Sequence, residues 1–142
     1  MGYEELVKRI KHHEGFRDSI YRDSLGKKTI GYGHLIVHED DFVEGRSYSK
    51  KELEETFKKD FLKAVDGANR ILDLSKIDPK AQDIVIEACF VLGVTGFSRF
   101  KRCVIVLEEH RYKDSSDELK DSLWYKQATN RVETLAKILE NL

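Results

Sequence analysis

Two acidic residues and a hydroxyl near the start of the chain could carry hydrolytic chemistry. Glu14 lies at the end of a short helical pattern, Asp23 follows after eight intervening residues, and Thr29 follows after five more. The glycines and alternating side chains of a tight β-hairpin surround the last two. Hydrolysis of a glycosidic bond needs such a carboxyl pair, because one group protonates the leaving oxygen while the other manages a water or a sugar cation.

Short-range patterns predict the elements that position these groups. Residues 3–14 carry apolar side chains at helical spacing, which predicts a short amphipathic helix. Residues 19–23 and 28–34 are typical of strands, and residues 24–27 of the turn between them. The helix would therefore end close to a hairpin that carries the second carboxylate and the hydroxyl.

Two glycines, Gly31 and Gly33, alternate within the second predicted strand. Glycine weakens a strand, so its presence there usually marks close approach by a ligand or by another backbone. A purely structural or partner-binding helical protein would leave these two glycines without an explanation.

A long helix follows the hairpin region. Ser49 and Glu52 have the spacing of a capping box, and the apolar stripe behind them continues to Leu72. A helix of about 22 residues would be about 33 Å long at 1.5 Å per residue. Because this exceeds one face of a small globule, we interpret the helix as a bridge between two lobes.

The remainder of the chain predicts helices. Asp78 and Pro79 form a start signal for a helix that runs to about Leu92 and is apolar on nearly every side, so it should be the buried centre of a second lobe. Further helices are expected near 98–110, 115–124 and 129–141. The predicted fold is α+β and mostly helical, in a single domain with three parts: an N-terminal lobe with the hairpin or sheet (1–48), a connecting helix (49–72) and a helical C-terminal lobe (73–142).

Composition and charge narrow the possible partners. The chain has 25 Lys and Arg against 26 Asp and Glu, a formal net charge of −1, so no global attraction to nucleic acid is expected. By its letters, no segment approaches the roughly 20 apolar residues of a membrane span, so no membrane insertion is expected. The first residues are charged and amphipathic, unlike a signal peptide, which predicts accumulation in the cytoplasm of the producing cell.

The sequence predicts neither a disulfide framework nor a metal site. Cys89 and Cys103 lie in apolar patterns and are expected to be reduced core thiols. The five histidines are scattered, and no partner set completes a metal-binding spacing, so we expect no metal and no cofactor.

The run from Glu14 to His34, EGFRDSIYRDSLGKKTIGYGH, resembles the catalytic segment of the phage-type lysozymes of glycoside hydrolase family 24. The spacing E-x8-D-x5-T is specific when I-G-x-G-H follows it, as it does here. The resemblance covers nearly the whole chain. FVLG at 90–93 looks like the family's cleft helix, and the segment from Ser122 to Arg131 looks like its C-terminal signature.

This resemblance implies a function and three roles. Glu14 would be the general acid, Asp23 the carboxylate that activates or positions water, and Thr29 the hydroxyl that holds this water. The family hydrolyses the β-1,4 bond between N-acetylmuramic acid and N-acetylglucosamine in peptidoglycan, with inversion. The expected partner is therefore the peptidoglycan glycan strand, attacked by a monomeric endolysin once the membrane has been permeabilised.

Further positions are implied by the resemblance alone. Leu35 and Phe90 match residues that line the sugar cleft, and Cys103 stands where a serine usually faces it, so these three are the expected substrate-binding residues. Val91 stands where the family carries Asn or Gln. Both departures favour an alternative function, a peptidoglycan-binding module that keeps the fold without cutting, whereas the intact catalytic set favours the enzyme.

Three supporting residues complete the expected site. Arg131 matches a buried arginine that pairs with the catalytic glutamate, here Glu14. His34 and Asp60 match a structural ion pair that ties the hairpin to the long helix.

Overall fold

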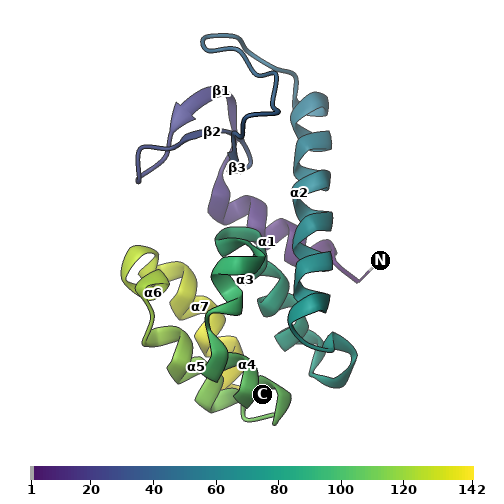
Figure 1. Ribbon diagram of the computed structural model, residues 1–142, viewed down its shortest axis with the longest axis vertical. Helices are drawn as coiled ribbons and strands as arrows, with labels where there is room; N and C mark the ends of the chain where they lie inside the picture. The colour runs from purple at the N-terminus through teal and green to yellow at the C-terminus, as the bar shows by residue number, and fades with distance from the viewer. Residues whose placement is uncertain (1) are drawn as a thin grey trace. The chain divides into compact units, whose positions relative to one another are not determined.

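The computed structural model describes residues 2–142 and divides into two compact units, one up to Leu62 and one from Lys63 onwards. The boundary falls within the long helix α2 (Lys50–Ile71), which therefore contributes residues to both units (Figure 1). A small antiparallel sheet near the N-terminus and a helical remainder confirm the predicted α+β, mostly helical class.

The N-terminal unit contains α1 (Glu4–Glu14) and a sheet of three strands, β1 (Arg17–Arg22), β2 (Lys28–Gly31) and β3 (His34–Leu35). The strands are antiparallel and neighbour one another in chain order (Figure 1). The prediction of a single strand over 28–34 was wrong, because the chain turns between Gly31 and His34 and its end pairs back on β2 as β3.

The sheet of this unit packs on the start of α2. Ile30, Tyr48 and Leu53 form its buried cluster, and partly buried apolar side chains surround them. The predicted capping box is confirmed, since the Glu52 N–H donates to Ser49 Oγ and the Ser49 N–H donates to Glu52 Oε1, both over 3.1 Å. The hairpin thus rests on a helix whose first turn is fixed.

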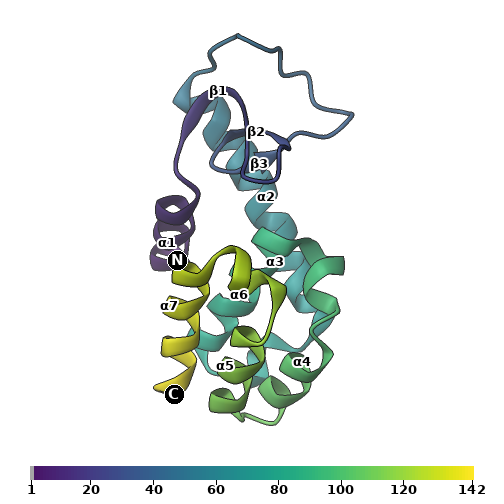
Figure 2. The same cartoon turned by 90° about the vertical axis from the view of Figure 1, so that its left-hand side faces the viewer.

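The C-terminal unit is helical, with the end of α2 followed by η1 (Leu74–Lys76), α3 (Pro79–Ser98), α4 (Lys101–Glu108), α5 (Tyr112–Lys120), α6 (Leu123–Gln127) and α7 (Thr129–Glu140) (Figure 2). The predicted start of α3 is confirmed, because Asp78 Oδ1 accepts from the Lys80 N–H over 2.8 Å. The prediction of one helix over 115–124 was wrong. Ser122 has extended backbone and caps a separate α6 by accepting from the Tyr125 N–H.

Helix α3 is long and apolar enough to cross a membrane when judged by length and composition, with a mean hydropathy of 1.4, so the expectation from the letters was too strict. The apolar composition of α3 fits its place in the core of the C-terminal unit. Gly93, at φ +77°, interrupts the helical geometry, and the helix buries eight residues, among them the charged Glu87. A core helix has the same composition as a membrane span.

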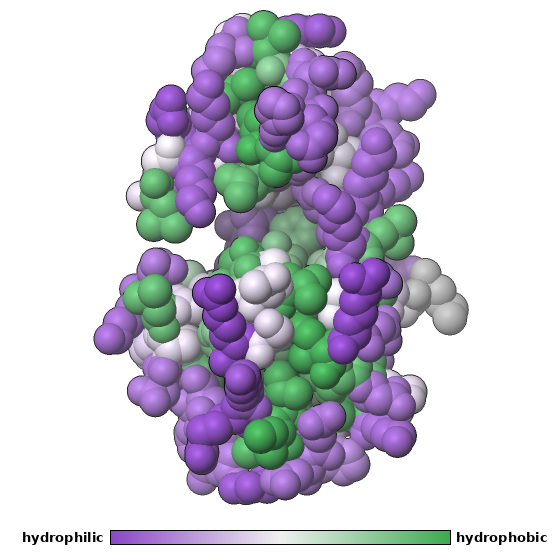
Figure 3. Space-filling model, in the orientation of Figure 1, coloured by the Kyte–Doolittle hydropathy of each residue, from purple (hydrophilic) through white to green (hydrophobic). Residues whose placement is uncertain are grey.

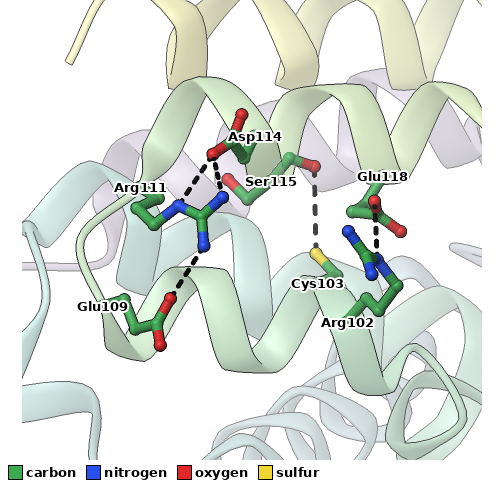
Figure 4. A network of polar contacts seen from close by, with 7 residues as sticks. All are labelled: Arg102, Cys103, Glu109, Arg111, Asp114, Ser115 and Glu118. Atoms are coloured by element: carbon green, nitrogen blue, oxygen red, sulfur yellow. Dashed lines mark hydrogen bonds and ion pairs between the residues drawn. The ribbon is translucent and has the colours of Figure 1, made fainter.

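Both thiols are buried and free, as predicted. Burial raises the pKa of Cys89 to about 11 and that of Cys103 to about 12, with the charge of Glu118 adding to the second effect. The Cys103 Sγ–H points at the Ser115 carbonyl oxygen, 3.9 Å away, where α4 and α5 lie side by side (Figure 4).

We expect both thiols to react slowly with Ellman's reagent in the folded protein and rapidly in denaturant. The thiolate is the reactive form, and burial disfavours it. Stopped-flow absorbance with and without guanidinium measures the two rates. Fast labelling of either cysteine in the folded state, or a mass lower by two hydrogens without reductant, would contradict this expectation.

Candidate active site

Glu14 is the last residue of α1, and its carboxyl group packs on the backbone of Gly33. A Cβ at Gly33 would overlap a carboxylate oxygen of Glu14 and would lie 2.8 Å from its Cδ. The predicted close approach at this glycine therefore exists, but a side chain makes it, rather than a ligand or a second backbone. The turn before β3 leaves space for the carboxyl group at the helix end.

Lys11, one helical turn before Glu14, ties α1 to α2. Its Nζ lies 2.8 and 2.7 Å from the two Glu54 carboxylate oxygens, and it also lies 4.8 and 4.9 Å from the ring centroids of Tyr32 and Phe57. The ion pair is about one-third exposed, so the aromatic contacts contribute to its placement. These contacts fix the end of the helix that carries Glu14.

Substitution of Gly33 by alanine should impair activity more than stability. At φ +73° a side chain costs about 1–2 kcal/mol, and the new methyl group would also displace the Glu14 carboxyl. Since a misplacement of about 1 Å can cost about 100-fold in rate, we expect a loss of that order in lysis. Gly45→Ala is the matched control, because Gly45 has φ +80° with nothing within 4 Å. Equal activity in the two variants would contradict the role of Gly33.

Asp23 follows β1 and organises the hairpin turn. Its Oδ1 accepts from the N–H groups of Leu25 over 2.9 Å and Lys27 over 2.8 Å, and its own N–H donates to the Lys27 carbonyl. These bonds fix the orientation of the carboxyl group. Within the described residues, Oδ2 accepts no hydrogen bond, so the second oxygen can receive one from a bound molecule.

Thr29, on β2, is 4% exposed, and its hydroxyl donates to the Lys27 carbonyl oxygen over 2.9 Å. The hydroxyl hydrogen is thereby committed to the backbone. Its oxygen retains lone pairs, so toward a further partner Thr29 acts as an acceptor.

Tyr21 connects the predicted residues and was missed from the sequence. It is the β1 partner of Thr29 in the strand register. Partial burial raises the pKa of Tyr21 above its usual 10, the charges of Glu14 and Asp23 raise it further, and Arg17 opposes them. Glu14 and Asp23 therefore both lie close enough to the Tyr21 phenol to raise its pKa. Its position two residues before Asp23, hence on the same side of an extended chain, was the available signal.

The predicted ion pair of His34 with Asp60 is present in the N-terminal unit, with Nδ1 2.8 Å from Asp60 Oδ2. Its second partner, Asp40, was not predicted. Asp40 Oδ2 lies 2.9 Å from His34 Nε2 and also accepts from the Val37 N–H. Burial by itself lowers the pKa of His34, but the hydrogen bonds to Asp60 and Asp40 outweigh it, and the net shift is upward.

The raised pKa of His34 gives its contribution to stability a defined pH dependence. The contribution is complete below the unfolded-state pKa of about 6.5 and is lost as pH rises through the higher folded value. His34→Gln should therefore destabilise the protein more at about pH 5 than at about pH 9. Denaturant unfolding at both pH values, with the exposed His38→Gln as control, measures this difference. An equal loss of unfolding free energy at both pH values would contradict a stabilising role for the ion pairs of His34 with Asp60 and Asp40.

The residues predicted to bind substrate lie in different surroundings. Leu35 is 45% exposed on β3, and Phe90 is half-buried in α3. Cys103 is 2% exposed and belongs to the wall of a pocket of about 610 Å³ among α3, α4, α5 and α6, whose lining also includes Trp124. On the face drawn in Figure 3, apolar side chains reach the surface of this unit between hydrophilic ones. The contacts of Leu35, Phe90 and Cys103 with a sugar stay predictions.

Arg131, in the first turn of α7, has a partner within its own unit. Its Nε donates to Glu87 Oε2 over 2.9 Å, and the two side chains are 10% and 0% exposed. Glu87 was not singled out from the sequence, where it is one acidic residue in an apolar helix. The predicted pairing of Arg131 with Glu14 stays a prediction.

Among residues 2–142 no group of three or more His, Cys, Asp or Glu side chains is arranged to hold a metal ion. The groups of the N-terminal unit that can take part in proton transfer or hydrogen bonding include the carboxyl groups of Glu14 and Asp23, Thr29 and Tyr21. A carboxyl pair with a fixed acceptor hydroxyl can donate a proton and orient a water.

Comparison with known proteins identifies the family of this chain. The family model described as Phage lysozyme matches residues 11–138. "Probable T4-type lysozyme 2" and "Probable T4-type lysozyme 1" of Dictyostelium discoideum are 27% and 26% identical over an alignment of 154 positions. Each alignment covers 92% of this chain and 91% of the relative. The pre-baseplate central spike protein Gp5 of Enterobacteria phage T4 is 24% identical over 94% of this chain but 27% of its own length. This chain belongs to the phage lysozyme family, a family of glycoside hydrolases.

Proposed function

We propose that this protein is an N-acetylmuramidase, which hydrolyses the β-1,4 bond between N-acetylmuramic acid and N-acetylglucosamine in bacterial peptidoglycan. The observation that carries the proposal is the placement of two carboxyl groups in one unit. Glu14, at the end of α1, packs on Gly33, and Asp23 is fixed by the N–H groups of Leu25 and Lys27 beside the strand pair that holds Thr29. Membership of the phage lysozyme family supports the choice of substrate.

Glu14 is the general acid of the proposed reaction. Glu14 is half-buried and packs on Gly33, so the position of its carboxyl group is restricted. Its proton passes to the glycosidic oxygen as the bond to the anomeric carbon breaks, which gives the leaving sugar a neutral hydroxyl.

Asp23 and Thr29 hold the attacking water. Because the Thr29 hydroxyl already donates to Lys27, a water beside it must donate to Thr29 Oγ1. The second hydrogen of the water then goes to Asp23 Oδ2, which takes the proton as the water oxygen bonds to the anomeric carbon. With both hydrogens engaged, a lone pair of the water is directed at the sugar.

This scheme leads to inversion. Water and leaving group occupy opposite faces of the sugar ring, so the two carboxyl groups must be farther apart than the roughly 5.5 Å of a retaining enzyme. A shorter distance would make Asp23 a nucleophile and would retain the configuration.

The test is digestion of purified peptidoglycan followed by identification of the new reducing end. We expect N-acetylmuramic acid at the reducing end, and proton NMR at early times should show the α-anomer formed from a β-linkage. A glucosamine reducing end or a retained configuration would overturn the assignment.

A peptidoglycan-binding module is the alternative, since Val91 and Cys103 depart from the family pattern. Sedimentation with insoluble peptidoglycan measures binding independently of cleavage. Binding without release of reducing ends would favour that alternative over the enzyme.

A further inference from the structure

Tyr21 lies on the face of the sheet that carries the proposed chemistry. It is the antiparallel partner of Thr29 between β1 and β2, and directly opposed residues place their side chains on the same side of a sheet. Asp23 lies two residues further along the chain, where an extended backbone returns to that side. The phenol thus shares this face of the sheet with Thr29 and Asp23.

The ring is held, but its hydroxyl is available. Arg17 places its Cζ 4.7 Å from the ring centroid, a cation–π contact that fixes the ring from the start of the same strand. In the described part of the chain, the Tyr21 hydroxyl makes no hydrogen bond. The side chain is half-buried, so part of it reaches solvent.

The groups near Tyr21 are hydrogen-bond acceptors, so its phenol adds a donor. The carboxyl oxygens of Asp23 accept hydrogen bonds, and Thr29 presents an acceptor because its hydrogen is committed to the Lys27 carbonyl oxygen. Such groups suit the hydroxyls of a sugar but repel the oxygen of an acetamido carbonyl, which has no hydrogen to give. A phenol is protonated at neutral pH, and the upward shift in the pKa of Tyr21, caused mainly by burial, favours this donor form further.

We propose that Tyr21 is a specificity-determining residue whose hydroxyl donates a hydrogen bond to the acetamido carbonyl of the sugar that is cleaved. The ligand class is an N-acetylated aminosugar, and the de-N-acetylated sugar lacks the acceptor. The inference rests on the proposed glycoside hydrolase function and adds a reason for substrate choice to it.

The experiment compares the parent protein and Tyr21→Phe on peptidoglycan before and after chemical de-N-acetylation, with kcat/KM measured on both. Loss of one hydrogen bond should lower the value for acetylated substrate about five- to tenfold in the variant, while the value for de-acetylated substrate changes less than about twofold. The preference for acetylated glycan should therefore nearly vanish.

Tyr48→Phe is the matched control. The Tyr48 hydroxyl accepts from the Val43 N–H over 2.8 Å in the same unit, so its loss should lower thermal stability and affect both substrates alike. An unchanged preference in Tyr21→Phe, or an equal loss on both substrates, would overturn the inference while leaving the hydrolase assignment intact. Failure of the parent protein to cleave either substrate would overturn the proposed function, and this inference with it.

Discussion

Glu14→Gln is expected to fold as the parent protein does and to lose lytic activity by about 100- to 10,000-fold, the range that a general acid contributes. The substitution keeps the shape of the side chain, so the close packing on Gly33 can persist. It removes the proton that the leaving oxygen must receive, and a carboxamide cannot supply one. We therefore expect the unfolding free energy to change by less than about 1 kcal/mol.

The measurement is the fall in turbidity of a cell-wall suspension, with circular dichroism and denaturant unfolding as tests of folding. Glu5→Gln is the matched control on the same helix, because Glu5 is 88% exposed and contacts Lys8 by a weak surface ion pair of 3.9 Å. The control should lyse like the parent. Lysis by Glu14→Gln at the parent rate would remove Glu14 from the mechanism.

Local patterns predicted the elements that carry the catalytic residues, because helix caps and strand alternation are short-range signals. The capping box at Ser49 and the cap at Asp78 were confirmed, and the predicted ends of α1 and the long helix lie within one residue of the observed ends. The third strand was missed because Gly31 and Gly33 were interpreted as marks of close approach. Both adopt positive φ, at +66° and +73°, and they turn the chain around Tyr32.

The side-chain network could not be predicted in the same way. The resemblance supplied the pair of His34 and Asp60, but Asp40 reaches the same imidazole from an irregular loop. Glu87 and Arg131 meet across 44 residues, and their pairing depends on how two helices pack. Neither contact leaves a periodic signal in the sequence, since an acidic residue in a loop or a helix is compatible with many partners.

The ion pair of Glu87 and Arg131 is expected to have the largest effect on stability. A cation in the first turn of a helix opposes the helix dipole, so local helix energetics do not explain Arg131 in α7. Its partner Glu87 is 0% exposed in α3, where an unpaired carboxylate would be costly. Arg131→Met should therefore lower the unfolding free energy by about 3–5 kcal/mol, the cost of leaving one member of a buried pair alone.

The pH dependence of this loss distinguishes a buried charge from lost packing. Acid neutralises buried carboxylates that have lost a cationic partner, so a charge effect in Arg131→Met should weaken at low pH. The variant should thus be closer to the parent protein at about pH 4 than at about pH 7. A loss of unfolding free energy of equal size at both pH values would indicate that the substitution removes packing alone.

A double-mutant cycle isolates the pair itself. Replacement of both members by apolar residues of similar size, Glu87→Leu with Arg131→Met, leaves no buried charge and is often near neutral. The double variant should therefore regain most of the stability lost by Arg131→Met, with a coupling of about 1–3 kcal/mol between the sites. Guanidinium unfolding of the four proteins under one buffer gives the coupling directly. Additive losses would mean that the two side chains do not stabilise each other, and the position of Arg131 would then need another explanation than its hydrogen bond to Glu87.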